Sequence, residues 1–575
     1  MSEITLDEMI AEVQEKEQNI KEPSIVTEMI QKACNEVFKA AKSGNVKVLT
    51  DYDADGICAA YIMRQTLLSV NPNADISVVC NDRRNSYGLS PNIQGDGKSA
   101  YIVLDMGSNQ LDLIKERLGE NTIVFDHHLI ADEKDKQAFK EQSNLLNPHC
   151  LTFKDGKTSE YCATGLAYRA YQELEGKMGE KFIHNEKQDN TIAAIACIGT
   201  CTDMVNVMDM YGYNRQIIKN GIDIINKADE TNFDFVIGNM LVKNGITEAE
   251  TNAHQLAFNV GAYLNAASRM SEIIAENGAQ IMFDTLTGSE SRETFIKIAD
   301  LCELNSERKT LIDELVTDTN YQDFVHEERF KDNNIAIYIL PDNTPSSFAG
   351  LIAGKLAEAT DKAIICLTYN TEKECYTGSG RNTPDNTSLM DFMKIATLDT
   401  EGKLDIKYGG HEDAIGISYL NDISLFKDKV DRNAFEMERK DISDKTVLNI
   451  DLSEVSSPET LDKLKALEPL GVGLQIPPVK VEGQELRRNV GHLKGRDDWK
   501  NISVKGVDAK ISDWSYQPEI YPQSGKKNNE IALLADISIS SFRGEHTELT
   551  AHFDRSFLQS RIKEIEKDKP VEKSK

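Results

Sequence analysis

The chain has 575 residues, of which 40% are hydrophobic, and a formal net charge of −29 at pH 7. This length predicts several domains with sizeable cores, and the strong acidity argues against indiscriminate phosphate binding over the whole surface. The longest apolar run, near Ile192–Ile198, is too short to span a bilayer, and the first residues lack the basic and apolar regions of a signal peptide. We therefore expect a cytoplasmic protein with no membrane partner.

Ten cysteines are scattered along the chain, and Cys197 and Cys201 form the only close pair. They show neither a disulfide framework nor a paired CxxC zinc pattern. Reduced and mostly buried thiols are expected.

The first half of the chain alternates short apolar strands with helical stretches. Residues 1–45 are expected to form an N-terminal helical segment, and residues 46–240 a doubly wound α/β domain with a parallel sheet. The predicted strands of this domain are 46–49, 76–79, 101–104 and 122–125, and its predicted helices include Cys58–Val70 and Gly165–Glu173.

The second half begins with a helical connector, residues 241–280, which shows no strand signal. A second mixed α/β domain is predicted over residues 281–440, and a C-terminal OB-like β-barrel over residues 441–562, followed by a charged tail, 563–575. Strands are expected at Ile335–Leu340, Ala363–Thr368, Ile415–Ser418, Ile502–Val504, Ile531–Ile539 and Glu548–Phe553, and Gly378–Arg381 is interpreted as a Gly-rich turn.

Three loops that follow predicted strands carry clustered charge. The residues concerned are Asp51, Asp53 and Asp55 after the first strand, Asp105 after the third, and Asp126, His127 and His128 after the fourth. Ligands gather at the carboxyl ends of parallel strands, so the three loops are expected to meet at one edge of the sheet. Carboxylates and imidazoles suit Mn²⁺, Mg²⁺ or Zn²⁺, and a set without cysteine favours the harder ions. Any one of these loops alone would equally be a cap or a turn.

Taken in order, these motifs resemble the signatures of the DHH phosphoesterases. The matching residues are Asp51-Tyr-Asp-Ala-Asp-Gly56, Asp105, Asp126-His127-His128 and Thr202-Asp203, with Gly409-Gly410-His411 resembling the signature of the domain associated with this family. Further matches to the single-strand-specific exonucleases of the family are Tyr87-Gly88-Leu89, Asn214-Arg215, Asn265–Met270, Leu304–Arg308, Gly378–Arg381, Glu468–Gly471 and Gly491–Leu493. The resemblance covers roughly residues 46–553.

Departures from the family pattern occur at a few positions. Ser268 stands where the family usually has Gly, Leu470 where it has Phe, and Leu474–Pro478 where it has an Asn-Pro stretch. The metal-binding residues of the family pattern are all present. A complete set of these residues with such departures elsewhere resembles a divergent member of the family, such as a phage or mobile-element copy.

The resemblance implies a site with two divalent ions, Mn²⁺ or Mg²⁺. Asp53 and Asp105 would hold one ion, and Asp55, Asp105, His127 and Asp203 the other. It also implies catalytic supporting roles for four residues: Asp51 and Asp126 would orient ligands, and His128 and His411 would face the substrate.

Substrate contacts are implied for arginine and serine residues. Arg83 or Arg84, Arg269, and Ser379 with Arg381 match positions where the family contacts the DNA backbone and the 5′-terminal phosphate. For one of Arg83 and Arg84, a solvated surface charge is the better interpretation. In the predicted barrel, Trp499 lies in a segment with a local excess of basic residues, as in OB-type barrels that bind single strands.

These inferences together predict a metal-dependent 5′→3′ exonuclease that releases 5′-mononucleotides from single-stranded DNA, acting in DNA repair or recombination. Its expected partners are single-stranded DNA and a single-strand-binding protein or a helicase, and a monomer is expected. Two alternatives stay open: a phosphodiesterase for short oligoribonucleotides or cyclic dinucleotides, and a non-catalytic nucleic-acid-binding subunit of similar fold. Loss of metal ligands would mark the second alternative, and none is lost in this sequence.

Overall fold

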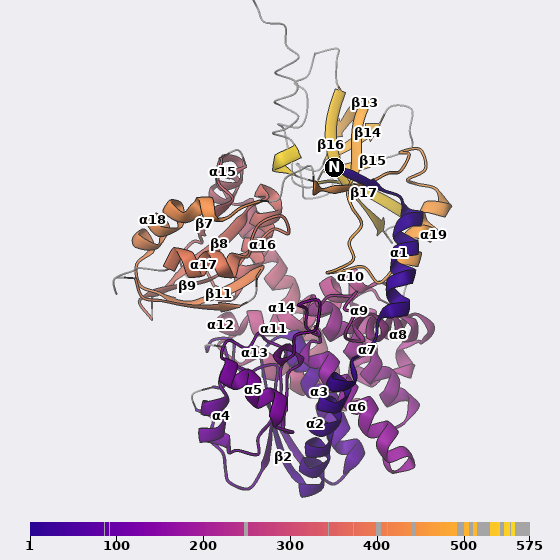
Figure 1. Cartoon of the computed structure of the whole chain (residues 1–575), viewed down its shortest axis with the longest axis vertical. Coiled ribbons are helices and arrows are strands. Elements are labelled where there is room, and N and C mark those ends of the chain that lie inside the picture. The colour runs from indigo at the N-terminus through magenta and orange to yellow at the C-terminus, as the bar shows by residue number, and fades with distance from the viewer. Residues whose placement is uncertain are drawn as a thin grey trace, which may run out of the picture. The chain divides into compact units, whose positions relative to one another are not determined.

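The computed structural model divides the chain into two compact units (Figure 1). The N-terminal unit comprises Gln14–Leu311 and Glu468–Gln475, and the C-terminal unit comprises Met1–Val13, Ile312–Leu467 and Ile476–Lys575. The structure describes all residues except 86, 91, 247–250, 330, 343, 372, 398–403, 411, 440–443, 491–499, 505–509, 514–529, 541–545, 553 and 558–575.

A five-stranded parallel sheet forms the centre of the N-terminal unit. Its strand order is β3-β2-β4-β5-β6. The strands are β2 (Asn45–Thr50), β3 (Asp75–Cys80), β4 (Ala100–Leu104), β5 (Ile123–Phe125) and β6 (Leu145–Leu146). The first four confirm the predicted strands, whereas β6 was not predicted because only two residues pair. The order reverses between β2 and β4, which makes their carboxyl ends the switch point of a doubly wound sheet, where ligands bind.

Helices cover this sheet, and α3 is the most deeply buried of those in contact with the site. Figure 1 shows α2, α3 and α6 near β2, and α3 packs against both α6 and α7. Residues 54–63 of α3 are all buried, as expected for a helix that is apolar on every side. The helices of this region are α2 (Ser24–Ser43), α3 (Ala54–Val70), α4 (Leu111–Leu118), α5 (Glu133–Glu141), α6 (Ala163–Met178), α7 (Glu186–Thr202), α8 (Asn214–Lys227) and α9 (Phe235–Lys243).

The described part of residues 241–280, the predicted helical connector, is mostly helical, and its role as a connector stays a prediction. It contains α10 (Ala253–Gln255), a π-helical turn at Leu256–Gly261, α11 (Ala262–Arg269), α12 (Ser271–Ile274) and α13 (Gly278–Leu286), and α14 (Arg292–Thr317) follows. The division between the two units falls within α14.

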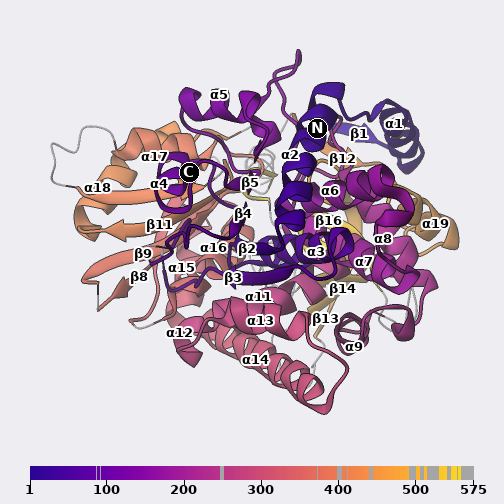
Figure 2. The same ribbon diagram turned by 90° about the horizontal axis from the view of Figure 1, so that it is seen from below.

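The C-terminal unit contains a second, mixed sheet, in the order β10-β11-β9-β8-β7. Figure 2 labels its strands β8, β9 and β11. Only β7 and β8 are parallel. The strands are β7 (Ile335–Ile339), β8 (Ala363–Asn370), β9 (Cys375–Arg381), β10 (Ile406–Gly410) and β11 (Ala414–Leu420), and the helices of this region are α15 (Thr319–Glu328), α16 (Ala349–Thr360), α17 (Leu389–Thr397) and α18 (Ile423–Asn433). The predicted strands of this domain are confirmed.

The interpretation of Gly378–Arg381 as a turn was wrong, because these residues lie in strand β9 between β8 and β11. A Cβ atom at Gly378 would lie 2.0 Å from the carbonyl oxygen of Cys366 on β8, and one at Gly380 would lie 2.8 Å from Ile415 on β11. The glycines therefore permit close approach of neighbouring elements and do not reverse the chain.

The remaining strands form a third sheet, in the order β1-β12-β13-β14-β15-β17-β16, with β13 also paired to β16. Its strands are β1 (Ser2–Ile4), β12 (Thr446–Leu448), β13 (Val479–Val490), β14 (Lys500–Val504), β15 (Lys510–Asp513), β16 (Glu530–Ser540) and β17 (His546–His552), and helices α1 (Leu6–Asn19) and α19 (Pro458–Leu467) accompany them in the sequence. Strand signals in this region are confirmed, and the OB-like barrel stays a prediction. Among the described helices, none combines the length and the apolar character needed to cross a bilayer.

Candidate metal centre

The three charged loops meet at the carboxyl edge of the parallel sheet. Thr50, Leu104 and Phe125, the last residues of β2, β4 and β5, lie in one row of the sheet register. The residue that follows each of these strands is an aspartate, so Asp51, Asp105 and Asp126 lie side by side at this edge of the sheet. This confirms the expected meeting of the loops.

The first loop is shaped by the start of α3. Asp53 is the N-cap of the helix and accepts a hydrogen bond from the Gly56 amide at 3.1 Å. The Thr50 hydroxyl donates to the Gly56 carbonyl oxygen at 2.7 Å. A Cβ atom at Gly56 would lie 2.9 Å from the Asp51 carbonyl oxygen and 3.1 Å from Oδ2 of Asp105. Gly56 thus lets the carboxylate of Asp105 approach the first turn of α3.

We predict that Gly56→Ala destabilises the protein and weakens divalent-ion binding. The added methyl group must displace backbone or Asp105, and overpacking of this kind costs about 1–3 kcal/mol. Thermal unfolding with and without Mn²⁺ measures both effects.

Gly176→Ala is the matched control for this substitution. Gly176 lies in α6, and a Cβ atom there meets nothing within 4 Å, so alanine should raise stability slightly through its better helix propensity. Equal melting temperatures for Gly56→Ala and wild type would contradict the packing argument.

Asp55 is fixed by the first turn of a second helix. Its two carboxylate oxygens accept hydrogen bonds from the amides of Ala163 and Thr164 at the start of α6, each at 2.8 Å. The Thr164 hydroxyl also donates to the Asp55 carbonyl oxygen at 2.9 Å. The positive end of the helix dipole stabilises a carboxylate in this position.

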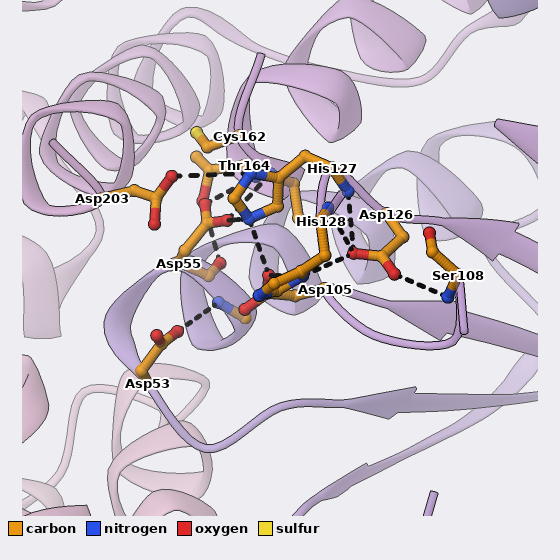
Figure 3. A network of polar contacts seen from close by, with 12 residues as sticks. Asp53, Asp55, Asp105, Ser108, Asp126, His127, His128, Cys162, Thr164 and Asp203 are labelled. Atoms are coloured by element: carbon orange, nitrogen blue, oxygen red, sulfur yellow. Dashed lines mark hydrogen bonds and ion pairs between the residues drawn. The ribbon is translucent and has the colours of Figure 1, made fainter. Parts of the chain in front are cut away.

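His127 lies among three carboxylates (Figure 3). Its Nε2 is 3.2 Å from Oδ1 of Asp105 and 3.6 Å from Oδ2 of Asp55, and its Nδ1 is 3.7 Å from Oδ2 of Asp203. Asp105 has a backbone φ of 60°, a left-handed conformation that is uncommon outside glycine and occurs at functional sites.

Asp126 is buried and surrounded by donors. Its Oδ2 accepts from the Ser108 amide at 2.8 Å, and its Oδ1 accepts from the His127 amide at 2.7 Å and lies 2.8 Å from Nδ1 of His128. Burial opposes its ionisation, but the attraction of His128 and the hydrogen bonds it accepts hold the pKa of Asp126 well below its ordinary value. Asp126 therefore shapes the loop and orients His128, whose ring also lies near the Tyr87 hydroxyl, 2.9 Å from Nδ1.

The other carboxylates repel one another. Burial and the charge of Asp53 raise the pKa of Asp51, while burial and the charges of Asp53 and Asp55 raise that of Asp105. Burial also raises the pKa of Asp203, although His127 opposes this shift. Oδ1 of Asp51 is buried and has no hydrogen-bond partner among the described residues. A divalent cation would neutralise this excess of negative charge, so the donor set fits one.

Three groups of side chains offer metal ligands within 4.8 Å of one another. They are Asp51, Asp53 and Asp105; Asp105, His127 and His128; and Asp55, Cys162 and Asp203. The five predicted metal ligands are thus all present in these groups, and Asp105 belongs to two of them.

Cys162 is the residue that the sequence analysis missed. The premise that no cysteine accompanies the carboxylates was wrong, because Cys162 is the N-cap of α6 and that helix begins against Asp55. The sequence signal is weak, since a lone cysteine before Ala163-Thr164-Gly165 gives no indication of which loop it meets.

The predicted arginines of the N-terminal unit differ in their surroundings. The guanidinium of Arg83 lies 4.2 Å from the centre of the Tyr52 ring, and its Nε donates to the Ser268 hydroxyl at 3.3 Å. Arg84 pairs with Asp82, Nε to Oδ1, at 3.0 Å and is the more solvated of the two arginines. Arg269 is the last residue of α11 and follows Ser268. Arg83, which lies beside the first loop, is thus the better candidate for a substrate contact.

Helix α11 also contacts the first loop directly. Oδ1 of Asn265 accepts a hydrogen bond from the amide of Ala54 at 3.0 Å. The segment that carries Arg269 is therefore held against the first residue of α3.

Ser379 and Arg381 lie together in the C-terminal unit. Nη1 of Arg381 donates to the Ser379 hydroxyl at 2.7 Å, and that hydroxyl donates to the Ile415 carbonyl oxygen at 2.7 Å. A Cβ atom at Gly350, in the first turn of α16, would lie 2.8 Å from Nη2 of Arg381. His411 and Trp499 lie outside the described residues.

A distant segment, Glu468–Gln475, supports the loop that follows Asp203. The amide of Val207 donates to the Val472 carbonyl oxygen at 2.8 Å, and Nη1 of the buried Arg215 donates to the Pro469 carbonyl oxygen at 2.8 Å. In the sequence, only the family matches at Asn214-Arg215 and Glu468–Gly471 pointed to these residues. Neither match indicated that the two segments contact each other.

The sequence of this chain is similar to those of several known proteins. Residues 45–200 match the model of the DHH family, N-terminal domain. The single-stranded-DNA-specific exonuclease RecJ of Bacillus subtilis is 22% identical over 529 residues, which are 88% of this chain and 60% of the relative. RecJ of Dickeya dadantii is 22% identical over 399 residues, which are 67% of this chain and 66% of that relative. The chain therefore spans less than two thirds of the length of these relatives.

The crystal structure of RecJ from Thermus thermophilus in complex with Mn²⁺ has a similar fold. It matches with a TM-score of 0.64 and 21% identity, covering 91% of this chain and 71% of that one. The fold, the match over residues 45–200 and the relatives in sequence agree with one another: residues 45–200 match the DHH family N-terminal domain, and the chain resembles RecJ.

Proposed function

We propose that this protein is a metal-dependent exonuclease that degrades single-stranded DNA from the 5′ end and releases 5′-mononucleotides. The observation that carries the proposal is the meeting of Asp51, Asp53, Asp55, Asp105, His127 and Asp203 at the switch point of the parallel sheet, with one buried carboxylate oxygen of Asp51 unpartnered among the described residues. The names of the relatives, single-stranded-DNA-specific exonucleases, support the choice of substrate.

Two divalent ions fit this donor set. Asp53 and Asp105 would hold one, and Asp55, Asp105, His127 and Asp203 the other, so Asp105 would contact both. When bound, such a pair activates water as a nucleophile and neutralises charge on the phosphoryl group and the leaving oxygen. The solved complexes of RecJ with Mn²⁺ and with Mg²⁺ support these ions for this chain as well.

The other residues of the centre would position the ligands and the substrate. The amides of α6 hold the carboxylate of Asp55 in place, and Asp126 holds the loop that carries His127 and His128. His128 would then contact the phosphate or the leaving oxygen. His411 would do the same, by resemblance.

Arginine would bind the substrate backbone. A guanidinium binds two phosphate oxygens at once, and Arg83, held by Tyr52 and Ser268, presents one beside the first loop. Arg269, and Ser379 with Arg381, would contribute further phosphate contacts, and Trp499 would stack on a base.

The test is digestion of labelled strands by the purified chain with Mn²⁺. We expect hydrolysis of single-stranded DNA to 5′-mononucleotides, little hydrolysis of blunt duplex DNA, and none after chelation of the metal. Cleavage restricted to short oligoribonucleotides or cyclic dinucleotides would reassign the substrate. Binding without any hydrolysis would make the chain a non-catalytic subunit.

A further inference from the structure

Ser268, one of the departures from the family pattern, contacts a residue that is expected to bind the substrate. It stands where the family usually has glycine, and its side chain is buried in α11. Its hydroxyl oxygen accepts a hydrogen bond from Nε of Arg83 at 3.3 Å. Because glycine has no hydroxyl, the usual family residue could not make this contact.

The hydroxyl of Ser268 is itself fixed in position. It donates to the carbonyl oxygen of Asn265, three residues earlier in α11, at 3.2 Å, so its lone pairs are left to accept from Arg83. A Cβ atom at Gly278, at the start of α13, would lie 2.8 Å from the amide nitrogen of Ser268. The backbone of Ser268 is therefore packed closely against a second helix.

The guanidinium of Arg83 is held at one edge and available at the other. The ring of Tyr52 covers one of its faces, with 4.2 Å between the guanidinium carbon and the ring centre. Among the described residues, only Ser268 accepts a hydrogen bond from this guanidinium, which leaves the Nη1 and Nη2 donors available. A half-buried arginine with two available donors is suited to an anionic ligand.

This arrangement favours one way of binding a phosphate. A guanidinium can bind two oxygens through Nε and one Nη atom, or through both Nη atoms. Ser268 occupies Nε, so the edge formed by Nη1 and Nη2 remains for the ligand. Tyr52 lies between Asp51 and Asp53 in the first loop, so a guanidinium fixed on its ring is also fixed relative to the metal centre.

We propose that Ser268 is a positioning residue whose hydroxyl holds Arg83 in the orientation that binds a strand phosphate through Nη1 and Nη2. The proposal rests on the proposed function. An arginine that is ordered before binding loses less rotamer freedom when the phosphate arrives, and that loss opposes binding. Because Ser268 is buried, it acts through Arg83 and does not contact the strand.

Ser268→Ala in the full chain tests this role, because it removes the hydroxyl and keeps the Cβ atom in a residue that favours helix. The KM for single-stranded DNA should rise by about 2–10-fold, as expected when one more side chain must be ordered on binding, and kcat should stay within about twofold of wild type. Ser268→Gly, which restores the usual family residue, should raise KM by a similar factor. An unchanged KM in both variants would overturn the proposal.

A double-mutant cycle with Arg83→Ala decides whether Ser268 acts through Arg83. Strand binding is measured in chains that also carry Asp105→Asn to prevent digestion. Arg83→Ala should weaken binding and flatten the slope of log K against log salt by about 0.7, the value for one phosphate contact. Ser268→Ala should leave the slope unchanged because the charge remains, and should have no further effect when Arg83 is already alanine. Equal effects of Ser268→Ala with and without Arg83 would refute the positioning role.

Ser69→Ala is the matched control. Ser69 is as buried as Ser268, and its hydroxyl also accepts a hydrogen bond from a side-chain N–H, that of Gln188, at 3.1 Å. It lies at the end of α3 that is far from the metal centre. Ser69→Ala should change neither KM nor the salt slope. A rise in KM as large as that of Ser268→Ala would show a general effect of losing a buried hydroxyl and would contradict the proposal.

The Nε–H signal of Arg83 tests the contact in the absence of substrate. In chains labelled with isotopic arginine, this nuclear magnetic resonance signal is the one that Arg83→Ala lacks. Its hydrogen should exchange slowly with water in wild type and faster in Ser268→Ala, and equal exchange rates would refute the contact. If wild type neither binds nor hydrolyses DNA, the proposed function fails and the substrate role of Ser268 with it, while this signal still decides whether the hydroxyl holds Arg83.

Discussion

Asp105→Asn is expected to reduce the rate of DNA hydrolysis by about 10³-fold or more. Asp105 belongs to two ligand groups, one with Asp51 and Asp53 and one with His127 and His128. Metal ions contribute several kcal/mol of charge stabilisation in the transition state, and each factor of ten in rate corresponds to about 1.36 kcal/mol. Loss of a ligand shared by the two proposed ions would remove much of that contribution at once.

Asparagine is the informative substitution because it should preserve the backbone. Asp105 has a φ of 60°, which asparagine tolerates and alanine does not. Asparagine also removes a buried charge whose ionisation is opposed by burial and by Asp53 and Asp55. The metal-free variant should therefore unfold at a higher temperature than the metal-free wild type, while the rise in melting temperature on adding Mn²⁺ should be smaller.

This pair of opposite effects distinguishes loss of the centre from loss of the fold. A misfolded variant would lose both activity and stability. Asp112→Asn is a matched control, because Asp112 is exposed and pairs with Lys134 at 2.9 Å on the surface. It should change neither quantity. A rate for Asp105→Asn within a few-fold of wild type would rule out a shared ligand.

The position of the centre could be predicted because its residues follow the sheet directly. Thr50, Leu104 and Phe125 end apolar runs, and each is followed by an aspartate. Parallel pairing brings successive strand ends to one edge, so local patterns were sufficient to place three loops together.

Cys162 could not be predicted because its neighbour depends on helix packing. α6 begins at Asp55 only because α3 and α6 pack together, and the amides of Ala163 and Thr164 then cap the Asp55 carboxylate. A sequence shows which residue is an N-cap, but not which side chain from another element the helix end will meet.

The support of Asp203 is a contact between residues far apart in the chain. Arg215 and Val207 bind the backbone of Glu468–Gln475, a segment that follows α19 and is otherwise surrounded in sequence by the C-terminal unit. Such contacts leave no periodic signal. The strand β9 was missed for a different reason: glycine is typical of turns, and its use for close approach between strands is visible only once the strands are paired.

Arg381→Ala is expected to remove a preference for strands with a 5′-phosphate over strands with a 5′-hydroxyl. Arg381 is bound to Ser379, and Gly350 leaves room beside the guanidinium at the start of α16. A guanidinium, a hydroxyl and the first turn of a helix are groups that bind phosphate. Hydrogen bonds to charged groups contribute about 1.5–3 kcal/mol, so the preference should fall by about 10–150-fold. Competition between the two kinds of strand in one digest measures it.

Strands blocked at one end decide whether this preference reflects the direction of degradation. If Arg381 anchors the 5′ terminus, a bulky 5′ block should stop wild-type digestion and a 3′ block should not, because an anchored end fixes which diester is presented for cleavage. Arg381→Ala should digest both 5′-phosphate and 5′-hydroxyl strands slowly and equally, whereas Asp105→Asn should digest neither. Arg432→Ala is the matched control, since Arg432 is exposed in the same unit and pairs with Asp428 at 2.7 Å. If a 3′ block stops digestion and a 5′ block does not, the protein degrades strands from the 3′ end. Arg381 would then have a structural role in β9, because anchoring of the 5′ terminus requires that the bound end and the cleaved end be the same.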